Sequence, residues 1–249
     1  MSFHSSIWVK DATVADSGQV FRRPLSFSEE TYYWDSVFRG TVTTLNMIEF
    51  TIEDADARTV FSQSSVESAW IRMKETWPLL GGWVNEKVGQ DGKEAFEFVV
   101  EERHLSSVRP GEVVVLHASS SEEATKIHEN IINSRDYLNA SEGLARLWVF
   151  HRLDDEKRVH VAFEFVHIIH DGFGLTTVMK DFCKILLSPD YRVTRTLEDR
   201  LRVLLPPEFV DPALEFSAAR RRWRKAIAKV MYANRQFRLH VRGLRLLIN

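Results

Sequence analysis

The chain has 249 residues, of which 44% are hydrophobic and 27% are charged, and its formal net charge is −2 at pH 7. This length is sufficient to bury a sizeable core, and the composition excludes general disorder. The N-terminus lacks the basic region and apolar run of a secretory signal, and no apolar segment is long enough to cross a bilayer. The single cysteine, Cys183, cannot form an internal disulfide. We therefore expect a protein of the cytoplasm.

The first predicted elements are a strand and an amphipathic helix. Residues 41–50 are rich in β-branched and apolar side chains, which favour a strand. The following helix is predicted to be capped by Ser64 or Ser65 and to end at Pro78, because proline lacks a backbone N–H. Its predicted apolar face consists of Val66, Ala69, Trp70 and Met73.

The middle of the chain alternates short strands with a helix. Residues 82–86 and 94–101 predict two strands, and residues 89–92 between them have the composition of a hairpin turn. Residues 113–116 predict a short buried strand. Residues 122–132 have helical spacing.

A strand pair and a helix surround a short histidine-containing segment. Residues 144–152 and 158–167 predict antiparallel strands, because only a polar turn separates them. Residues 173–187 have the spacing of an amphipathic helix. One face of the second strand consists of Val159, Val161, Phe163, Phe165 and His167.

His167, Asp171 and Gly172 form the pattern His-x-x-x-Asp-Gly between the strand and the helix. An imidazole at the inner end of a strand is well placed for a general base, although a single histidine there is more often a core or surface residue. A carboxylate at a helix start is favoured by the exposed N–H groups, so Asp171 could equally be only a helix cap. Glycine at 172 permits close approach of a ligand to the backbone.

The strand, the pattern at His167, Asp171 and Gly172, and the following helix resemble the active-site segment of the CoA-dependent acyltransferases. This superfamily includes the BAHD-type enzymes of plants and fungi, chloramphenicol acetyltransferase and the condensation domains of peptide synthetases. Val166 stands where condensation domains usually have a second histidine. Two further phrases, Arg-Pro-Leu-Ser at 23–26 and Trp-Pro-Leu-Leu at 77–80, are also similar to phrases of the family.

The resemblance implies an α+β fold, a two-layer sandwich with a mixed, mostly antiparallel sheet and helices on one side, as in chloramphenicol acetyltransferase. It implies transfer of an acyl group from a CoA thioester to the hydroxyl or amine of a small acceptor, with secondary metabolism as the expected setting. His167 would be the catalytic base, Asp171 would hold the loop by an ion pair, and Gly172 would contact substrate. His170 and Glu164 are expected to orient or bind substrate, although neither matches a fixed position of the motif.

No permanently bound cofactor is expected, because acyl-CoA is a donor substrate. A metal site is not expected either. His160 and His167 point to opposite strand faces, His170 is the third nearby histidine, and no carboxylate set completes the group.

We expect residues 1–190 to form an acyltransferase-like N-terminal lobe, and residues 191–249 to form a crossover, with a short helix at 197–205 and a basic C-terminal helix at 213–231. Two-lobe members of the superfamily are about twice as long, and their second lobe carries an Asp-Phe-Gly-Trp-like motif that is absent here. A second lobe or self-association would then complete the site. The alternative is a non-catalytic half-enzyme or a partner-binding module.

The basic character of the C-terminal segment leaves three roles open. From Phe216 onward the chain has ten lysine and arginine residues and no acidic residue. First, the segment could be a solvated helix face or a helix docked on the rest of the chain. Second, it could bind an acidic membrane surface or, less favoured, nucleic acid. Third, it could contact a second lobe or the phosphates of CoA.

Overall fold

The computed structural model describes residues 8–12, 18–39, 43–53, 55–88, 94–133, 138–170, 172–188 and 191–207, together with 217, 219, 222, 223 and 226. The chain divides into two compact units, Met1–Pro206 and Pro207–Asn249. The helices and strands discussed below belong to the first unit. The predicted hairpin turn at 89–92 lies outside the described residues, and the predicted basic helix at 213–231 lies largely outside them.

The first unit contains two four-stranded sheets. One sheet has the order β1-β2-β5-β4, and each neighbouring pair in it is antiparallel. Its strands are β1 (Val9–Lys10), β2 (Val20–Pro24), β4 (Trp83–Val88) and β5 (Glu94–Glu101). The predicted strands at 82–86 and 94–101 correspond to β4 and β5.

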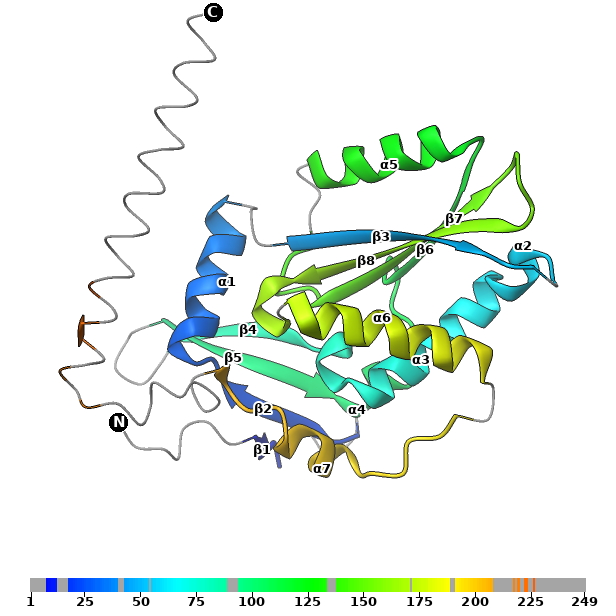
Figure 1. The fold of residues 1–249 in the computed structure, drawn as a ribbon. Helices are drawn as coiled ribbons and strands as arrows, with labels where there is room; N and C mark the ends of the chain where they lie inside the picture. Colours follow the sequence, from blue (N-terminus) through cyan, green and yellow to red (C-terminus); the bar gives the residue numbers. More distant parts are fainter. Residues whose placement is uncertain are drawn as a thin grey trace, which may run out of the picture. The chain divides into compact units, whose positions relative to one another are not determined.

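The second sheet has the order β3-β8-β7-β6 (Figure 1). Its strands are β3 (Thr43–Thr51), β6 (Val113–Ala118), β7 (Ala145–Arg152) and β8 (Arg158–Val166). β8 is antiparallel to both β3 and β7, whereas β6 and β7 are parallel. The predicted α+β class with a mixed, mostly antiparallel sheet is therefore confirmed. The sequence did not predict that the strands would divide into two sheets.

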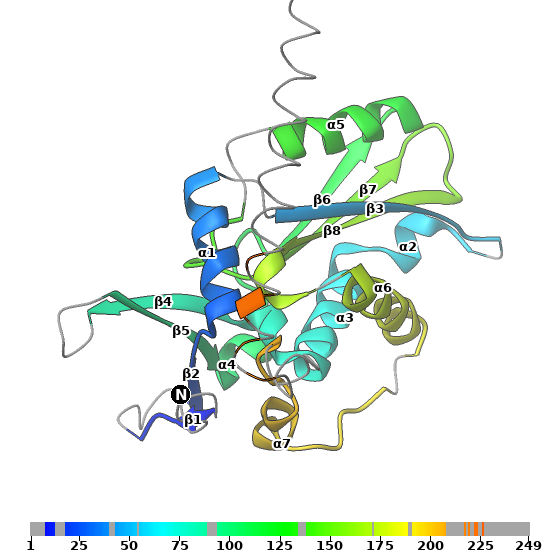
Figure 2. The same cartoon turned by 60° about the vertical axis from the view of Figure 1, so that its left-hand side comes forward.

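Helices cover both faces of the second sheet, whereas the sequence predicted helices on one side only. The described helices are α1 (Phe27–Arg39), α2 (Ala57–Val60), α3 (Gln63–Thr76), α4 (Glu102–Leu105), α5 (Ser121–Asn133), α6 (Gly172–Leu187) and α7 (Leu197–Arg202), with short 3-10 helices η2 (Pro78–Gly81) and η3 (His167–Ile169). α3 and α6 lie side by side on one face, and α5 lies against the other (Figures 1 and 2).

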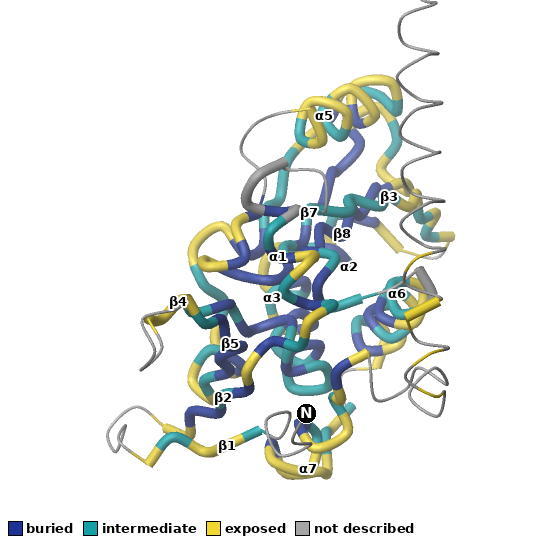
Figure 3. Tube along the Cα trace, turned by 90° about the vertical axis from the view of Figure 1, so that its left-hand side faces the viewer, coloured by how far each residue is buried: buried dark blue, intermediate teal, exposed yellow. Residues whose placement is uncertain are grey.

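β8 passes through the centre of the core, and its trace is buried in Figure 3. The predicted alternation is confirmed for the four apolar residues that face α3 and α6, which are Val159, Val161, Phe163 and Phe165. The ring of Phe163 meets that of Phe182 on α6 edge to face, with 5.3 Å between centroids. Burial of these side chains fixes the position of α6 on the sheet.

Two helix starts differ from the sequence predictions. α3 begins at Gln63 with Ser62 as its N-cap residue, so Ser64 and Ser65 lie inside the first turn. α1 was not predicted, and its start is a capping box. The Ser26 N–H donates to Glu29 Oε2 at 2.8 Å, and the Glu29 N–H donates to Ser26 Oγ at 3.4 Å. Glu29 also forms a buried ion pair with Arg23 at 2.7 Å.

Buried histidines make the stability of the fold depend on pH. His151 on β7 is 4% exposed, and its Nε2–H donates to the Phe61 carbonyl at 3.1 Å. Burial lowers its pKa, and His117 nearby lowers it further. As the pH falls below about 6.5, the unfolded chain therefore binds the proton first, and the free energy of unfolding decreases.

We expect urea unfolding to show lower stability at about pH 5.5 than at about pH 7.5, the sign that follows from the lowered pKa. The variant His151→Gln keeps an N–H donor but cannot titrate, so it should lose less stability over this interval. An equal loss in both proteins would contradict the role given to His151.

Candidate functional site

The site lies where β8 passes through η3 into α6. The antiparallel ladder ends at Val166, which pairs with Thr43 and whose N–H donates to the Leu144 carbonyl at 3.0 Å. The strand was predicted to include His167, but His167 is instead the first residue of η3. The 3-10 turn therefore takes the imidazole out of the strand alternation, and His167 is half-buried.

The ring of His167 has a defined hydrogen bond at one nitrogen. Nδ1 lies 2.9 Å from the backbone carbonyl oxygen of His170. A carbonyl only accepts, so Nδ1 carries the proton and donates it. In the neutral ring, Nε2 then carries the lone pair and is able to accept a proton.

Residues from α1 and β3 complete the surroundings of this ring. Tyr32 on α1 lies with its ring centroid 4.7 Å from that of His167, and α1 stands beside η3 in Figures 1 and 2. Thr44 Oγ1 on β3 lies 2.6 Å from His170 Nε2, at hydrogen-bonding distance. The His170 ring lies 5.1 Å from that of His167 and 5.3 Å from that of Phe165. Sequence reasoning missed Tyr32 and Thr44, because neither α1 nor the β3–β8 pairing was predicted.

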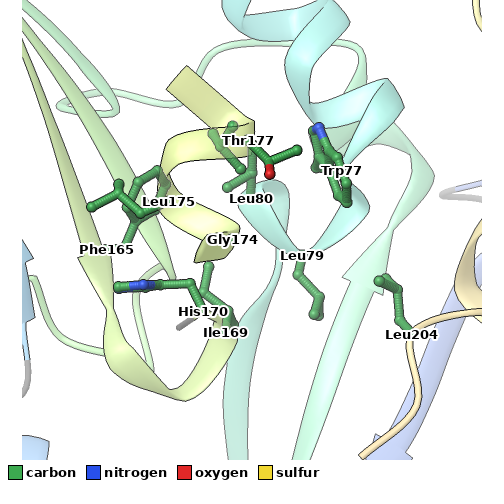
Figure 4. A pocket seen from close by; sticks show the side chains of 11 residues that line it. Trp77, Leu79, Leu80, Phe165, Ile169, His170, Gly174, Leu175, Thr177 and Leu204 are labelled. Carbon is green, nitrogen blue, oxygen red and sulfur yellow. The ribbon is translucent and has the colours of Figure 1, made fainter. Parts of the chain in front are cut away.

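An apolar pocket of about 180 Å³ has the His170 side chain in its lining (Figure 4). Its lining comes from the end of α3 and η2, from the first turns of α6, and from the ends of β8 and η3. The residues that line it are Trp77, Leu79, Leu80, Phe165, Ile169, His170, Gly174, Leu175, Thr177, Val178 and Leu204. The Trp-Pro-Leu-Leu phrase noted in the sequence thus supplies one side of this pocket.

The remaining predicted site residues have different environments. Gly172 is the first residue of α6, and Asp171 lies outside the described residues. Glu164 is buried away from His167. It accepts hydrogen bonds from the Leu138 N–H and the Trp148 Nε1–H, both at 3.0 Å. Through these bonds Glu164 holds the backbone at Leu138 and the indole of Trp148 on β7.

The predicted placement of His160 and His167 on opposite strand faces does not apply, because His167 lies in η3 beyond the end of β8. His160 itself is buried on β8. Its Nε2 lies 3.1 Å from Glu49 Oε2 and 3.5 Å from Ser121 Oγ. Within the described part of the chain, no cluster of three or more histidine, cysteine or acidic residues is arranged to hold a metal ion. No helix among the described residues is both long and apolar enough to cross a membrane.

Comparison with solved structures identifies the fold. The trichothecene 15-O-acetyltransferase from Fusarium sporotrichioides superposes with a TM-score of 0.63 at 11% identity, over 92% of this chain and 48% of that one. The chain has the CoA-dependent acyltransferase fold. The condensation domain of the monacolin K polyketide synthase MokA shares it, with a TM-score of 0.51 at 13% identity, over 69% of this chain and 35% of that one.

A further structure with the acyltransferase fold is the starter condensation domain of the rhizomide synthetase RzmA. Its TM-score is 0.50 at 9% identity, over 66% of this chain and 38% of that one. The chain thus spans about half or less of the length of the solved structures it matches. No family model and no curated protein matches the sequence.

Proposed function

We propose that the chain takes part in acyl transfer from a CoA thioester to the hydroxyl or amine of a small acceptor, with His167 as the general base. The observation that carries the proposal is the hydrogen bond from His167 Nδ1 to the His170 carbonyl at 2.9 Å. This bond directs the lone pair to Nε2 and fixes the ring plane. The name of the Fusarium enzyme, an O-acetyltransferase with the same fold, supports a hydroxyl acceptor and an acyl donor.

In this mechanism His167 Nε2 accepts the proton of the acceptor as its oxygen or nitrogen attacks the thioester carbonyl. The resulting tetrahedral intermediate collapses when the C–S bond breaks. The Nε2–H then returns its proton to the departing CoA sulfur, so the histidine ends in its starting state. Proton transfer by a positioned base of this kind typically contributes about 10²–10⁴-fold to the rate.

Neighbouring residues would position the base. The His170 carbonyl holds His167 Nδ1, and Thr44 holds the His170 ring through the 2.6 Å contact with Nε2. We propose that Asp171 holds the loop structurally and that Gly172, at the start of α6, allows the substrate to approach the backbone. Residues 1–190 would form the lobe that carries this site.

The test is release of free CoA thiol by the full chain, measured with acetyl-CoA and hexanoyl-CoA against a panel of alcohols and amines. We expect release to depend on the acceptor and to produce the matching ester or amide, detected by mass spectrometry. Thiol release that is equal with and without every acceptor, or no release at all, would contradict the proposal.

A further inference from the structure

The pocket beside His170 has the size and lining of a binding site for a small apolar group. Its volume is about 180 Å³, and leucine, isoleucine, valine and aromatic side chains form most of its surface. For comparison, an apolar protein cavity of about 150 Å³ stays dry and binds benzene. The pocket therefore matches a compact group of about six carbons.

Interactions outside the pocket hold two of its sides in place. The Trp8 Nε1–H donates to the Leu204 carbonyl at 3.3 Å, and the Leu204 N–H donates to the Leu201 carbonyl at 3.0 Å. At another part of the lining, the Trp77 Nε1–H donates to Asp181 Oδ2 on α6 at 3.2 Å. The Trp8–Leu204 and Trp77–Asp181 bonds join segments far apart in the sequence, so the pocket is formed before any ligand binds.

His170 connects the pocket to the proposed base. Its side chain lines the pocket, while its backbone carbonyl accepts the hydrogen bond from His167 Nδ1. Figure 4 shows the His170 ring beside Ile169 and Gly174 at one end of the pocket. The His170 end of the pocket is therefore the end adjacent to the residue that holds the proposed base.

We infer that this pocket binds the compact apolar end of the substrate, a group of about six carbons. The inference rests on the proposed function, because acyl transfer requires such a group to be attached to a reacting carbonyl, hydroxyl or amine. The group belongs either to the acyl donor or to the acceptor, and the experiment below separates these two sources.

The variant Leu175→Phe tests the pocket by filling it. Leu175 is half-buried on α6 and lines the pocket. The matched control is Leu186→Phe, on the same helix, equally half-buried and packed against the same core, but outside the pocket. Thr177→Phe is a second filling variant at an exposed position of the lining, where the core is not disturbed.

Binding is measured by methyl NMR of the full chain during titration with three kinds of probe. The probes are benzene alone, a series of CoA thioesters from acetyl to octanoyl, and a series of primary alcohols from methanol to octanol. We expect benzene to shift the methyl signals of Leu79, Ile169 and Val178, and not to shift them in the filling variants. Affinity should rise about fourfold per methylene in the thioester or the alcohol series, and stop rising near six carbons.

The series that shows this length dependence identifies whether donor or acceptor carries the group. Leu186→Phe should bind all probes as the original chain does. Benzene shifts that are absent, that lie elsewhere, or that persist in both filling variants would overturn the inference. Benzene binding to the pocket of a chain that has no transfer activity would refute the proposed function but not the inference about the pocket. Acceptor-dependent transfer without any preference for chain length would refute the inference about the pocket but not the proposed function.

Discussion

Replacing His167 with alanine is expected to reduce the rate of acyl transfer by about 10²–10⁴-fold, because the proton of the acceptor would no longer have a positioned base. The fold should survive the change. His167 is half-buried in a short 3-10 turn, and its side-chain hydrogen bond is made to the nearby His170 carbonyl. We therefore expect the free energy of unfolding to change by no more than about 1.5 kcal/mol, the usual net contribution of one hydrogen bond.

The measurement is kcat/KM for the acceptor, with urea unfolding of the same protein samples. His117→Ala is the matched control, because His117 is an exposed histidine on β6, far along the chain from the site. It should retain the original activity. Equal activity in the His167 and His117 variants would remove His167 from the mechanism, and unfolding of the His167 variant alone would show a structural role.

The second large effect concerns a buried ion pair between α3 and the segment that precedes β6. Lys74 on α3 is fully buried, and its Nζ lies 2.8 Å from Glu112 Oε2. Nζ also donates to the Ser107 carbonyl. Burial lowers the pKa of Lys74, while Glu112 opposes this shift by stabilising the ammonium. Removing the carboxylate in Glu112→Ala leaves the ammonium buried without its counter-charge, so we expect a loss of stability of about 3–5 kcal/mol.

Urea unfolding of three variants tests this expectation. The exposed pair of Glu198 and Arg202 on α7, at 2.6 Å, is the control, and Glu198→Ala should cost less than about 1 kcal/mol. The double variant Lys74→Met, Glu112→Leu should recover most of the loss, because apolar side chains of similar size replace both charges. A loss in Glu112→Ala as small as that in Glu198→Ala would show that the buried pair does not contribute as described.

Local sequence patterns were sufficient to predict the strand and the helix on either side of the proposed base. The alternation along β8 and the helical spacing of α6 are properties of neighbouring residues, so both elements and the antiparallel pairing of β7 with β8 were predicted correctly. The end of the strand was misplaced by one residue at His167. The last pair of the ladder is Val166 with Thr43, and His167 begins the 3-10 turn η3. Pairing with β3 is a contact between distant segments, which the local alternation does not report.

The remainder of the site depends on contacts between distant segments. α1 carries large apolar side chains on its exposed side as well as on its buried side, since Phe27 is 70% exposed whereas Tyr33 is 1% exposed. A buried ion pair between Arg23 and Glu29 holds its start. Thr44 reaches His170 only because β3 pairs with β8 across more than a hundred residues. The pocket likewise combines η2, α6 and Leu204, which no local pattern brings together.

The state of the His167 ring tests the central claim most directly, because it does not require the acceptor to be known. Nitrogen-15 NMR of the full chain, labelled at histidine and assigned with His167→Ala, distinguishes the two ring tautomers. At a pH where the ring is neutral, the structure predicts a proton on Nδ1, donated to the His170 carbonyl, and a lone pair on Nε2. A proton found mainly on Nε2 would contradict the claim, because that nitrogen could not then accept the proton of an attacking alcohol or amine.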